Sequence, residues 1–170
     1  MESNIILYIA ASLDMYIARE NGDVDWLFQD GDYGYEKFYS EIGYTLMGSK
    51  TYEQVLSFGE WPYKEKINYV FTREAGKEDT DQVKFFSGDI PSFLKKLKQQ
   101  AKEHIWLIGG GEIIRICLSA DLVDELRIFV HPIVLGKGIP LFIPQEQQIN
   151  FQLKKVNPFP NGLLELHYQK

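Results

Sequence analysis

Three features that mark particular classes of protein are scarce in this sequence. Its 170 residues include one cysteine, so no internal disulfide can form. The N-terminal apolar run is too short to span a membrane, and no basic stretch precedes it as in a secretory signal. Lys and Arg total 18 against 24 Asp and Glu, which argues against general electrostatic binding of nucleic acid or acidic membranes. We therefore expect a cytoplasmic protein that binds any anion through local features.

The composition is that of an ordinary globular domain. Hydrophobic residues make up 45% of the chain and charged residues 25%, and no low-complexity tract interrupts it. At this length we expect a single domain over residues 1–170. Cys117 lies on an apolar helix face with no base beside it in the sequence, so we interpret it as part of the core. We expect no metal site.

The stretch Ile105–Glu112 combines an apolar run, three glycines and the start of a helical pattern. A continuous apolar run is typical of a strand that is covered on both faces. Gly109, Gly110 and Gly111 let the backbone approach a ligand closely. The predicted helix Glu112–Ser119 directs N–H groups and its positive dipole end at an anion. A tight turn without a ligand is the alternative, because a glycine cluster alone is a weak indication.

A second junction of the same kind lies earlier in the chain. The short apolar strand Tyr44–Met47 precedes it, and a helix over Lys50–Phe58 follows. Such a strand–glycine–helix junction also favours an anion. Its glycine, two hydroxyl groups and lysine belong to Gly48, Ser49, Thr51 and Lys50.

Thr72 and Arg73 follow the predicted strand Ile67–Phe71. A hydroxyl group and a planar guanidinium suit a phosphate monoester. A solvated arginine after a strand is the simpler interpretation of these two residues alone.

The segment Met15–Asp32 has few periodic apolar residues, and we predict a long loop. Loops longer than about 12–15 residues in compact domains are usually lids or binding loops. Trp26 and Leu27 are apolar enough to cover a ligand, or they pin the loop to the core. Apolar residues at helical spacing then predict a helix over Tyr33–Ile42, and either Asp30 or Asp32 is placed to cap it.

The elements alternate between strand and helix and then change to strands alone. This order predicts an α/β fold with a mainly parallel central sheet and an antiparallel C-terminal edge. The Gly- and Pro-rich segment 133–142 predicts a structured loop. The other predicted strands are Ile5–Ala11, Val83–Phe86, Glu125–Val130, Phe151–Val156 and Leu163–Tyr168, and the other predicted helix is Ile90–Lys102.

Motifs in three parts of the chain resemble those of the dihydrofolate reductases in order and spacing. They are Met47-Gly48-Ser49-Lys50-Thr51-Tyr52-Glu53, Val70-Phe71-Thr72-Arg73 and Ile108-Gly109-Gly110-Gly111-Glu112. The whole chain resembles that superfamily, and some segments are more similar to the branch that includes the reductase domain of bacterial riboflavin biosynthesis. Those segments are Ser12-Leu13-Asp14, Tyr16-Ile17-Ala18, Gly22–Leu27 and Pro132–Gly138. The resemblance implies a dihydrofolate reductase-like three-layer α/β/α fold.

The resemblance also implies a cofactor and its site. It implies an NADPH-dependent reductase that transfers a hydride to a pyrimidine- or pteridine-like small molecule, such as a riboflavin precursor. Thr72 and Arg73 would bind the 2′-phosphate, Ala11 and Ile17 would line the nicotinamide, and the Gly109–Gly110 peptide is expected to be cis. The other implied cofactor-binding residues, at the two glycine junctions, are Gly48, Ser49, Lys50, Thr51, Ile108, Gly109, Gly110, Gly111, Glu112 and Ile113.

On the substrate side, Asp32 corresponds to the carboxylate with which dihydrofolate reductases orient the pterin and assist its protonation. A helix cap is the alternative role for Asp32. Trp26 corresponds to a loop tryptophan of the family, and we expect Trp26, Leu27 and Asp14 to contact the substrate.

Several residues depart from the family patterns. Ser49 stands where dihydrofolate reductases commonly have arginine, and Lys66 stands where an arginine binds the folate tail. Met15 replaces a glycine of the riboflavin branch, and no extended basic set for a ribose phosphate is visible. A genuine dihydrofolate reductase and a nucleotide-binding regulatory protein without catalysis are the alternatives. The aliphatic segment Glu125–Phe142, together with sheet-edge pairing in the riboflavin branch, leads us to expect a homodimer.

Overall fold

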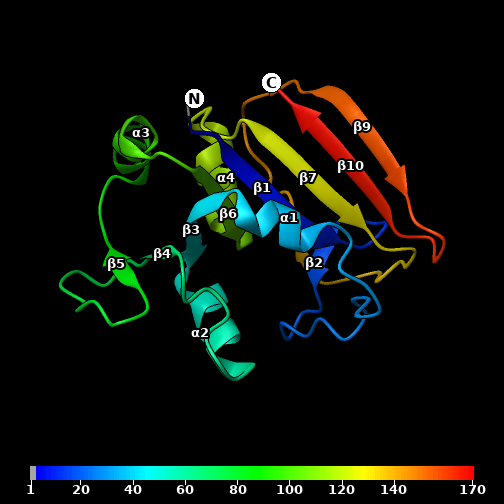
Figure 1. The fold of residues 1–170 in the computed structure, drawn as a ribbon, viewed down its shortest axis with the longest axis horizontal. Coiled ribbons are helices and arrows are strands. Elements are labelled where there is room, and N and C mark those ends of the chain that lie inside the picture. Colours follow the sequence, from blue (N-terminus) through cyan, green and yellow to red (C-terminus); the bar gives the residue numbers. More distant parts are fainter. Residues whose placement is uncertain (1–2) are drawn as a thin grey trace.

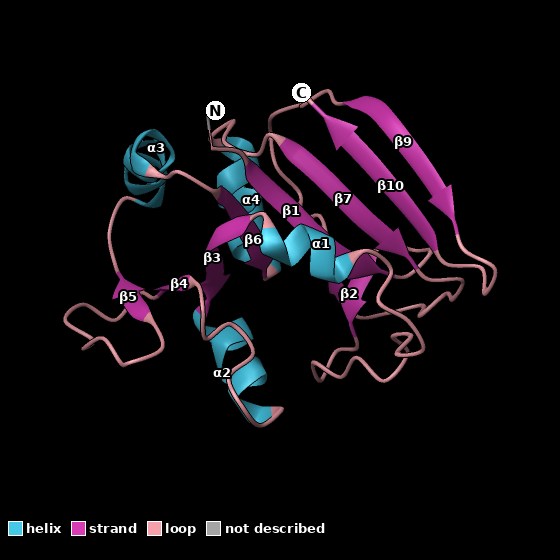
Figure 2. Ribbon diagram, in the orientation of Figure 1, coloured by secondary structure: helices cyan, strands magenta, loops and turns pink. Residues whose placement is uncertain are grey.

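A computed structural model describes residues 3–170 of the chain. Its centre is an eight-stranded sheet (Figures 1 and 2). The strands are β1 Ile5–Ala11, β2 Tyr16–Ala18, β3 Ile42–Gly48, β4 Ile67–Phe71, β5 Lys84–Phe86, β6 His104–Gly109, β7 Glu125–Val130, β8 Ile139–Pro140, β9 Gln152–Pro158 and β10 Leu164–Gln169. The helices are α1 Tyr35–Ser40, α2 Ser49–Ser57, α3 Ile90–Gln100 and α4 Gly111–Ser119.

The strand order in the sheet is β5-β4-β3-β6-β1-β7-β10-β9. The first six of these strands are parallel to one another, and β10 pairs antiparallel with both β7 and β9. Continuous apolar sequences form the central strands because helices cover both of their faces. The predicted parallel sheet with an antiparallel C-terminal edge is confirmed.

Two apolar clusters separate the layers of the fold. Phe38 of α1 and Tyr52 of α2 belong to the cluster on one face of the sheet. Leu94 of α3 and Ile114 of α4 belong to the cluster on the other face. Cys117 is fully buried in the second cluster, where burial raises the pKa of its thiol to about 12. The three-layer α/β/α arrangement and the core position of Cys117 are confirmed.

Two boundaries near α1 differ from the sequence prediction. The helix begins at Tyr35 and not at Tyr33, because Gly34 adopts a left-handed conformation with a φ of 88°. It ends at Ser40, because Ile42 is fully buried and begins strand β3, whereas Tyr44 was the predicted start. Burial against the sheet thus takes precedence over the helical spacing of Ile42.

The two predicted loops also contain a small second sheet. Strand β2, in the first loop, pairs with β8, in the second. A Cβ atom on Gly138 would lie 2.3 Å from the carbonyl oxygen of Ala18, so only glycine permits this approach. The loops are therefore tied to each other at one end of β1. Within residues 3–170, no helix is long and apolar enough to cross a membrane.

Candidate functional site

The parallel strands bring the two glycine junctions together at one edge of the sheet. In the register of β3 with its two neighbours, Met47 lies opposite Gly109 of β6, and Gly48 lies opposite Phe71 of β4. Thr72 and Arg73 follow Phe71 directly. In open α/β sheets, ligands bind outside the carboxyl ends of the strands. Three segments that are distant in the sequence therefore form one candidate site.

Two helices begin at this edge without a side-chain cap. The N-cap residues are Gly48 for α2 and Gly110 for α4, and neither supplies a side-chain hydrogen bond. At α3, in contrast, the Asp89 carboxylate accepts a hydrogen bond from the backbone N–H of Ser92 at 3.1 Å. The first N–H groups of an uncapped helix need an acceptor. Phosphate oxygens of a ligand would supply that acceptor for α2 and α4.

The glycines leave little room for a side chain between the two helix starts. A Cβ atom on Gly110 would lie 3.3 Å from Thr51 Oγ1, and one on Gly48 would lie 3.3 Å from Ile113 Cγ1. The Gly109–Gly110 peptide is cis, as the resemblance implied. The two junctions therefore touch each other, and backbone N–H groups of both helices border the same space.

The positively charged side chains of the predicted cofactor site, Lys50 and Arg73, lie at the exposed edge of the two glycine junctions. Lys50 and Arg73 are exposed, and no carboxylate between residues 3 and 170 forms an ion pair with either. The Ser49 hydroxyl donates to the carbonyl oxygen of Phe71 at 3.0 Å, so it joins β3 to β4. Two free cations and two uncapped helices fit the phosphate groups of a dinucleotide.

The predicted nicotinamide side lies at the end of β1. Ala11 is fully buried, and its carbonyl oxygen accepts a hydrogen bond from the N–H of His131 at 2.8 Å. Ile17 is half-buried and packs against the core from β2. Both residues are thus near the same sheet edge as the glycine junctions, since β1 is parallel to its neighbour β6.

Trp26 is held against the body of the protein by His131. The two rings pack edge to face with centroids 5.2 Å apart, and Trp26 is 8% exposed. His131 Nε2 accepts the N–H of Phe28 at 3.2 Å, and Nδ1 lies 3.2 Å from the carbonyl oxygen of Phe129. Leu27, between the two aromatic residues, is half-buried. Trp26 and Leu27 thus pin the loop, and their contact with a substrate stays a prediction.

Asp14 holds the loop formed by segment 133–142. Its carboxylate accepts hydrogen bonds from the Ser12 hydroxyl at 2.6 Å and from the N–H groups of Leu135 and Gly136 at 3.1 and 2.8 Å. These bonds lower the pKa of Asp14, and the bond from Ser12 has the largest effect. Asp14 therefore positions segment 133–142 beside the β1 end, whereas its role as a substrate ligand is a prediction.

Asp32 is exposed beside the start of α1. Its two carboxylate oxygens accept the N–H groups of Gly34 and Glu36, both at 2.9 Å. The capping role is thus present in the structure. The negative charge of Asp32 also contributes to a raised pKa of Tyr8, which lies on the sheet below α1. The proposed catalytic role of Asp32 remains a prediction beside its capping role.

Comparison with protein families agrees with this geometry. The model of the RibD C-terminal domain matches residues 3–164, which is nearly the whole described chain. The chain belongs to the RibD C-terminal domain family. This membership bears out the resemblance to the riboflavin branch of the dihydrofolate reductase superfamily.

Individual relatives match nearly the full length of the chain. The uncharacterized protein YwjB of Bacillus subtilis is 38% identical over 99% of this chain and 98% of its own. A solved structure of a putative riboflavin biosynthesis protein from Shewanella sp. PV-4 has 30% identity and a TM-score of 0.86, covering 99% of this chain and 98% of that one. The deaminase/5-amino-6-(5-phosphoribosylamino)uracil reductase of Thermotoga maritima shares the fold, with 18% identity and a TM-score of 0.76 over 99% of this chain and 56% of that one.

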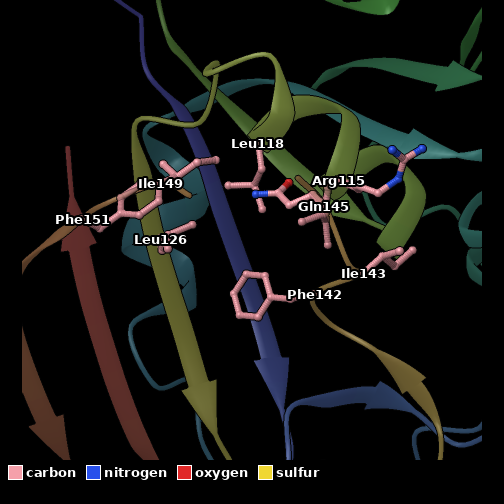
Figure 3. Close-up of a pocket in the computed structure, with 9 residues that line it drawn as sticks. Arg115, Leu118, Leu126, Phe142, Ile143, Gln145, Ile149 and Phe151 are labelled. Carbon is pink, nitrogen blue, oxygen red and sulfur yellow. The ribbon is translucent and has the colours of Figure 1, made fainter. Parts of the chain in front are cut away.

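A cavity of 240 Å³ lies behind α4 and not at the glycine junctions (Figure 3). Apolar side chains from α4, β7 and segment 142–151 surround it, including Leu118, Leu126 and Phe142. Ile143, from the same segment, would lie 3.0 Å from a Cβ atom on Gly111. Ligand pockets usually measure about 300–1,000 Å³. We interpret this smaller cavity as the gap beneath a segment that supports the start of α4.

Sequence reasoning missed the role of His131. The only local signal is its place before Pro132 and directly after strand β7. Besides the carbonyl oxygen of Phe129, its side chain contacts Trp26 and Phe28, which lie more than 100 positions away. A histidine in this sequence context gives no indication of such partners.

Proposed function

We propose that this protein is an NADPH-dependent reductase that transfers a hydride to a pyrimidine- or pteridine-like small molecule. The main support is the meeting of two uncapped helix starts, where Gly110 faces Thr51 and leaves space for phosphate oxygens. Arg73 and Lys50 are the cations for the phosphate groups, and membership of a family with reductase relatives supports the reaction type.

In this proposal, NADPH supplies the hydride to a C=N or C=O carbon of the substrate, and the neighbouring nitrogen or oxygen gains a proton. The chain itself binds and orients. Backbone N–H groups of α2 and α4 hold the diphosphate, Arg73 holds the 2′-phosphate, and Ala11 with Ile17 borders the nicotinamide. Asp32 assists proton delivery to the substrate.

The first test is stabilisation by the cofactor. A ligand at 100 times its dissociation constant stabilises the folded state by about 2.7 kcal/mol. The melting temperature should therefore rise with NADPH and rise less with NADH. Absence of a shift with either cofactor at millimolar concentration rules the proposal out. Oxidation of NADPH, followed by absorbance across a set of pterins and ribosylaminopyrimidines, then identifies the substrate.

A nucleotide-binding protein without catalysis is the second candidate, and the capping bonds of Asp32 favour it. The Asp32→Asn variant separates the two, since asparagine retains acceptor capacity for the cap. Unchanged turnover of every accepted substrate contradicts the catalytic role of Asp32. If no heterocycle consumes NADPH although NADPH binds, the binding protein is the better description.

A genuine dihydrofolate reductase is the third candidate. The residue expected to bind the folate tail is Lys66, whose ammonium group lies 4.3 Å from the ring centre of Tyr39. Lysine lacks the two-pronged geometry with which arginine binds a carboxylate. We expect little or no turnover of dihydrofolate, and a direct assay decides this.

For the assembly, we propose a homodimer. Strand β9 is the exposed edge of the sheet, and Leu153 and Val156 on it are 54% and 45% exposed. Exposed apolar edge strands favour pairing with another chain. Light scattering should give the mass of a dimer, and Val156→Lys should shift it toward a monomer. A monomeric mass for the unmodified protein contradicts the proposal.

A further inference from the structure

A row of polar side chains crosses the sheet on the face that α1 covers. The strand register places Tyr8 of β1 opposite Arg127 of β7, and Arg127 opposite His167 of β10. His167 is in turn opposite Lys155 of β9. Residues opposite each other in a sheet project from the same face. Four side chains from distant segments therefore lie side by side, which no local pattern in the sequence indicates.

These side chains line a cavity of 460 Å³ between α1 and the antiparallel side of the sheet. This volume lies within the range of about 300–1,000 Å³ that is usual for ligand sites. Lys37 and Glu41 of α1 also line it, and Phe159 lines it from the turn between β9 and β10. The cavity is thus bordered by four separate stretches of the chain.

Aromatic rings form much of the cavity wall. Tyr8 stacks on Phe38 with ring centroids 4.0 Å apart, and its ring is 4.7 Å from that of Phe129. Tyr33 packs edge-on against Phe159 at 5.0 Å. All five aromatic side chains are among those that line the cavity. Such walls favour a flat ring, because aromatic pairs gain from stacked and edge-to-face contacts.

Positive side chains reach the cavity from three elements. Lys37, Arg127 and Lys155 line it together with two carboxylates, Glu41 and Glu165. Throughout residues 3–170, no carboxylate forms an ion pair with Lys37 or Lys155. Lys37 and Lys155 are therefore available to an anionic ligand, although the chain as a whole has a formal net charge of −6.

Contacts with Glu125 and Phe38 hold the Arg127 side chain in place. Its Nη2 lies 3.3 Å from Glu125 Oε2, and the same oxygen lies 2.9 Å from His167 Nε2. Glu125 also accepts the side-chain N–H of Asn4 at 2.9 Å. The guanidinium carbon of Arg127 is 5.6 Å from the ring centre of Phe38. The arginine is thus held in place while it borders the cavity.

Tyr8 supplies a hydrogen-bond donor to the same space. Burial, followed by the negative charges of Glu165 and Asp32, raises the pKa of Tyr8. Its hydroxyl group therefore stays protonated over the physiological pH range. A protonated phenol donates to an anionic or carbonyl oxygen.

We propose that this cavity binds a small molecule with a flat aromatic ring and a single negative charge. The ring would pack among Tyr8, Phe129 and Phe159, and the anion would lie near Arg127 and Lys155. Glu41 and Glu165 disfavour a second negative charge. The site is distinct from the glycine junctions, because its strands β7, β10 and β9 lie on the other side of β1 from β3 and β4. The proposal does not depend on the reductase activity.

The probe for the test is naphthalene-1-sulfonate, which has a fluorescent ring and one negative charge. Titration of the unmodified protein should give saturable binding, whereas methanesulfonate and 1-naphthylmethanol, each lacking one feature, should bind more weakly. Lys155→Met should weaken binding of the probe by about three- to fivefold, which is the upper range for one exposed ion pair. The matched control is Lys154→Met, because Lys154 lies at a β-bulge beside Lys155 and is not among the residues that line the cavity.

Phe159→Leu, which leaves every charge in place, should also weaken binding of the probe. Binding should persist at saturating NADP⁺, since the two sites are separate. Displacement by NADP⁺, an equal effect of the two lysine variants, or no binding at millimolar probe overturns the proposal. A dimer that dissociates in Lys155→Met but not in Lys154→Met would also overturn it, because a second copy of the chain would then cover this face.

Discussion

The two sides of the central sheet place their polar groups differently. On the parallel side, which comprises β3, β4 and β6, the polar groups follow the strand ends and lie next to glycines in the sequence. On the antiparallel side, which comprises β7, β10 and β9, they project from the middle of the strands and come from distant segments. The first arrangement is visible in local motifs, whereas the second exists only through the strand register.

The two sides also differ in the chemistry of their buried polar groups. Asn68 of β4 is neutral, and its side-chain amide donates to the carbonyl oxygens of Tyr63, Lys66 and Gln82 at 2.9–3.0 Å. Glu125 of β7 is charged and, at 5% exposure, is bonded to Asn4, Arg127 and His167. A buried charge needs its partners more than a neutral amide does. The antiparallel side should therefore be the more sensitive to substitution and to acid.

The largest expected effect is on the antiparallel side. Glu125→Ala should lower the free energy of unfolding by about 3 kcal/mol, because it leaves Arg127 partly buried without its carboxylate. Glu112→Ala, which removes the exposed partner of Arg115, should cost less than about 1 kcal/mol. Urea denaturation of both variants measures the difference, and equal losses would contradict the contrast between buried and exposed pairs.

The next effect concerns the parallel side and the proposed cofactor. Arg73→Ala should weaken NADPH binding by about tenfold or more, since hydrogen bonds to charged groups contribute about 1.5–3 kcal/mol. It should leave the unfolding free energy nearly unchanged, because Arg73 is exposed. Arg115→Ala is the control, because Arg115 of α4 is paired with Glu112 and is not a predicted cofactor ligand, and calorimetric titration compares the two variants. A similar loss in both variants would mean that Arg73 does not contact a phosphate.

A smaller effect on stability is expected from loss of the cap of α3, the helix that differs from the uncapped α2 and α4. Asp89→Ala should lower the unfolding free energy by about 1 kcal/mol through loss of the α3 cap. NADPH affinity should change little, because α3 follows the outermost strand β5 and its first turn packs on Phe71 and Phe86, not between the two glycine junctions. Thermal unfolding with and without NADPH tests both parts. A change in cofactor affinity would contradict the assignment of the site to α2 and α4 alone.

The smallest expected effect is the pH dependence from His131. Burial lowers the pKa of His131 below 6.5, although its backbone hydrogen bonds oppose this shift. The unfolded chain therefore binds a proton more readily, so stability is full above pH 6.5 and decreases as the pH falls below it. His131→Gln should flatten the stability profile in this window. An unchanged profile would show that another group causes the decrease.

A second acid window belongs to Glu125. Burial alone would raise the pKa of Glu125, but Asn4, Arg127 and His167 together lower it below 4.5. The stability from this carboxylate is present above pH 4.5 and is lost as the pH falls through the lowered value. Glu125→Gln should reduce the decrease below pH 4.5, to which Asp14 also contributes, and leave the His131 window intact.

The sequence by itself determined the features that depend on neighbouring residues. Apolar runs placed the central strands, and alternation of strand and helix predicted the parallel sheet with its antiparallel edge. The glycines at Gly48 and Gly109–Gly111 marked both helix starts of the candidate cofactor site. These predictions succeed because periodicity and backbone freedom are local properties.

Only the tertiary structure decided the features that depend on distant partners. It placed Ile42 in strand β3, tied β2 to β8, and packed Trp26 against His131. It also brought Tyr8, Arg127 and Lys155 to one cavity, although no basic set was visible in the sequence. The physical reason is that strand register and burial select partners over more than 100 residues, and no local propensity encodes that choice.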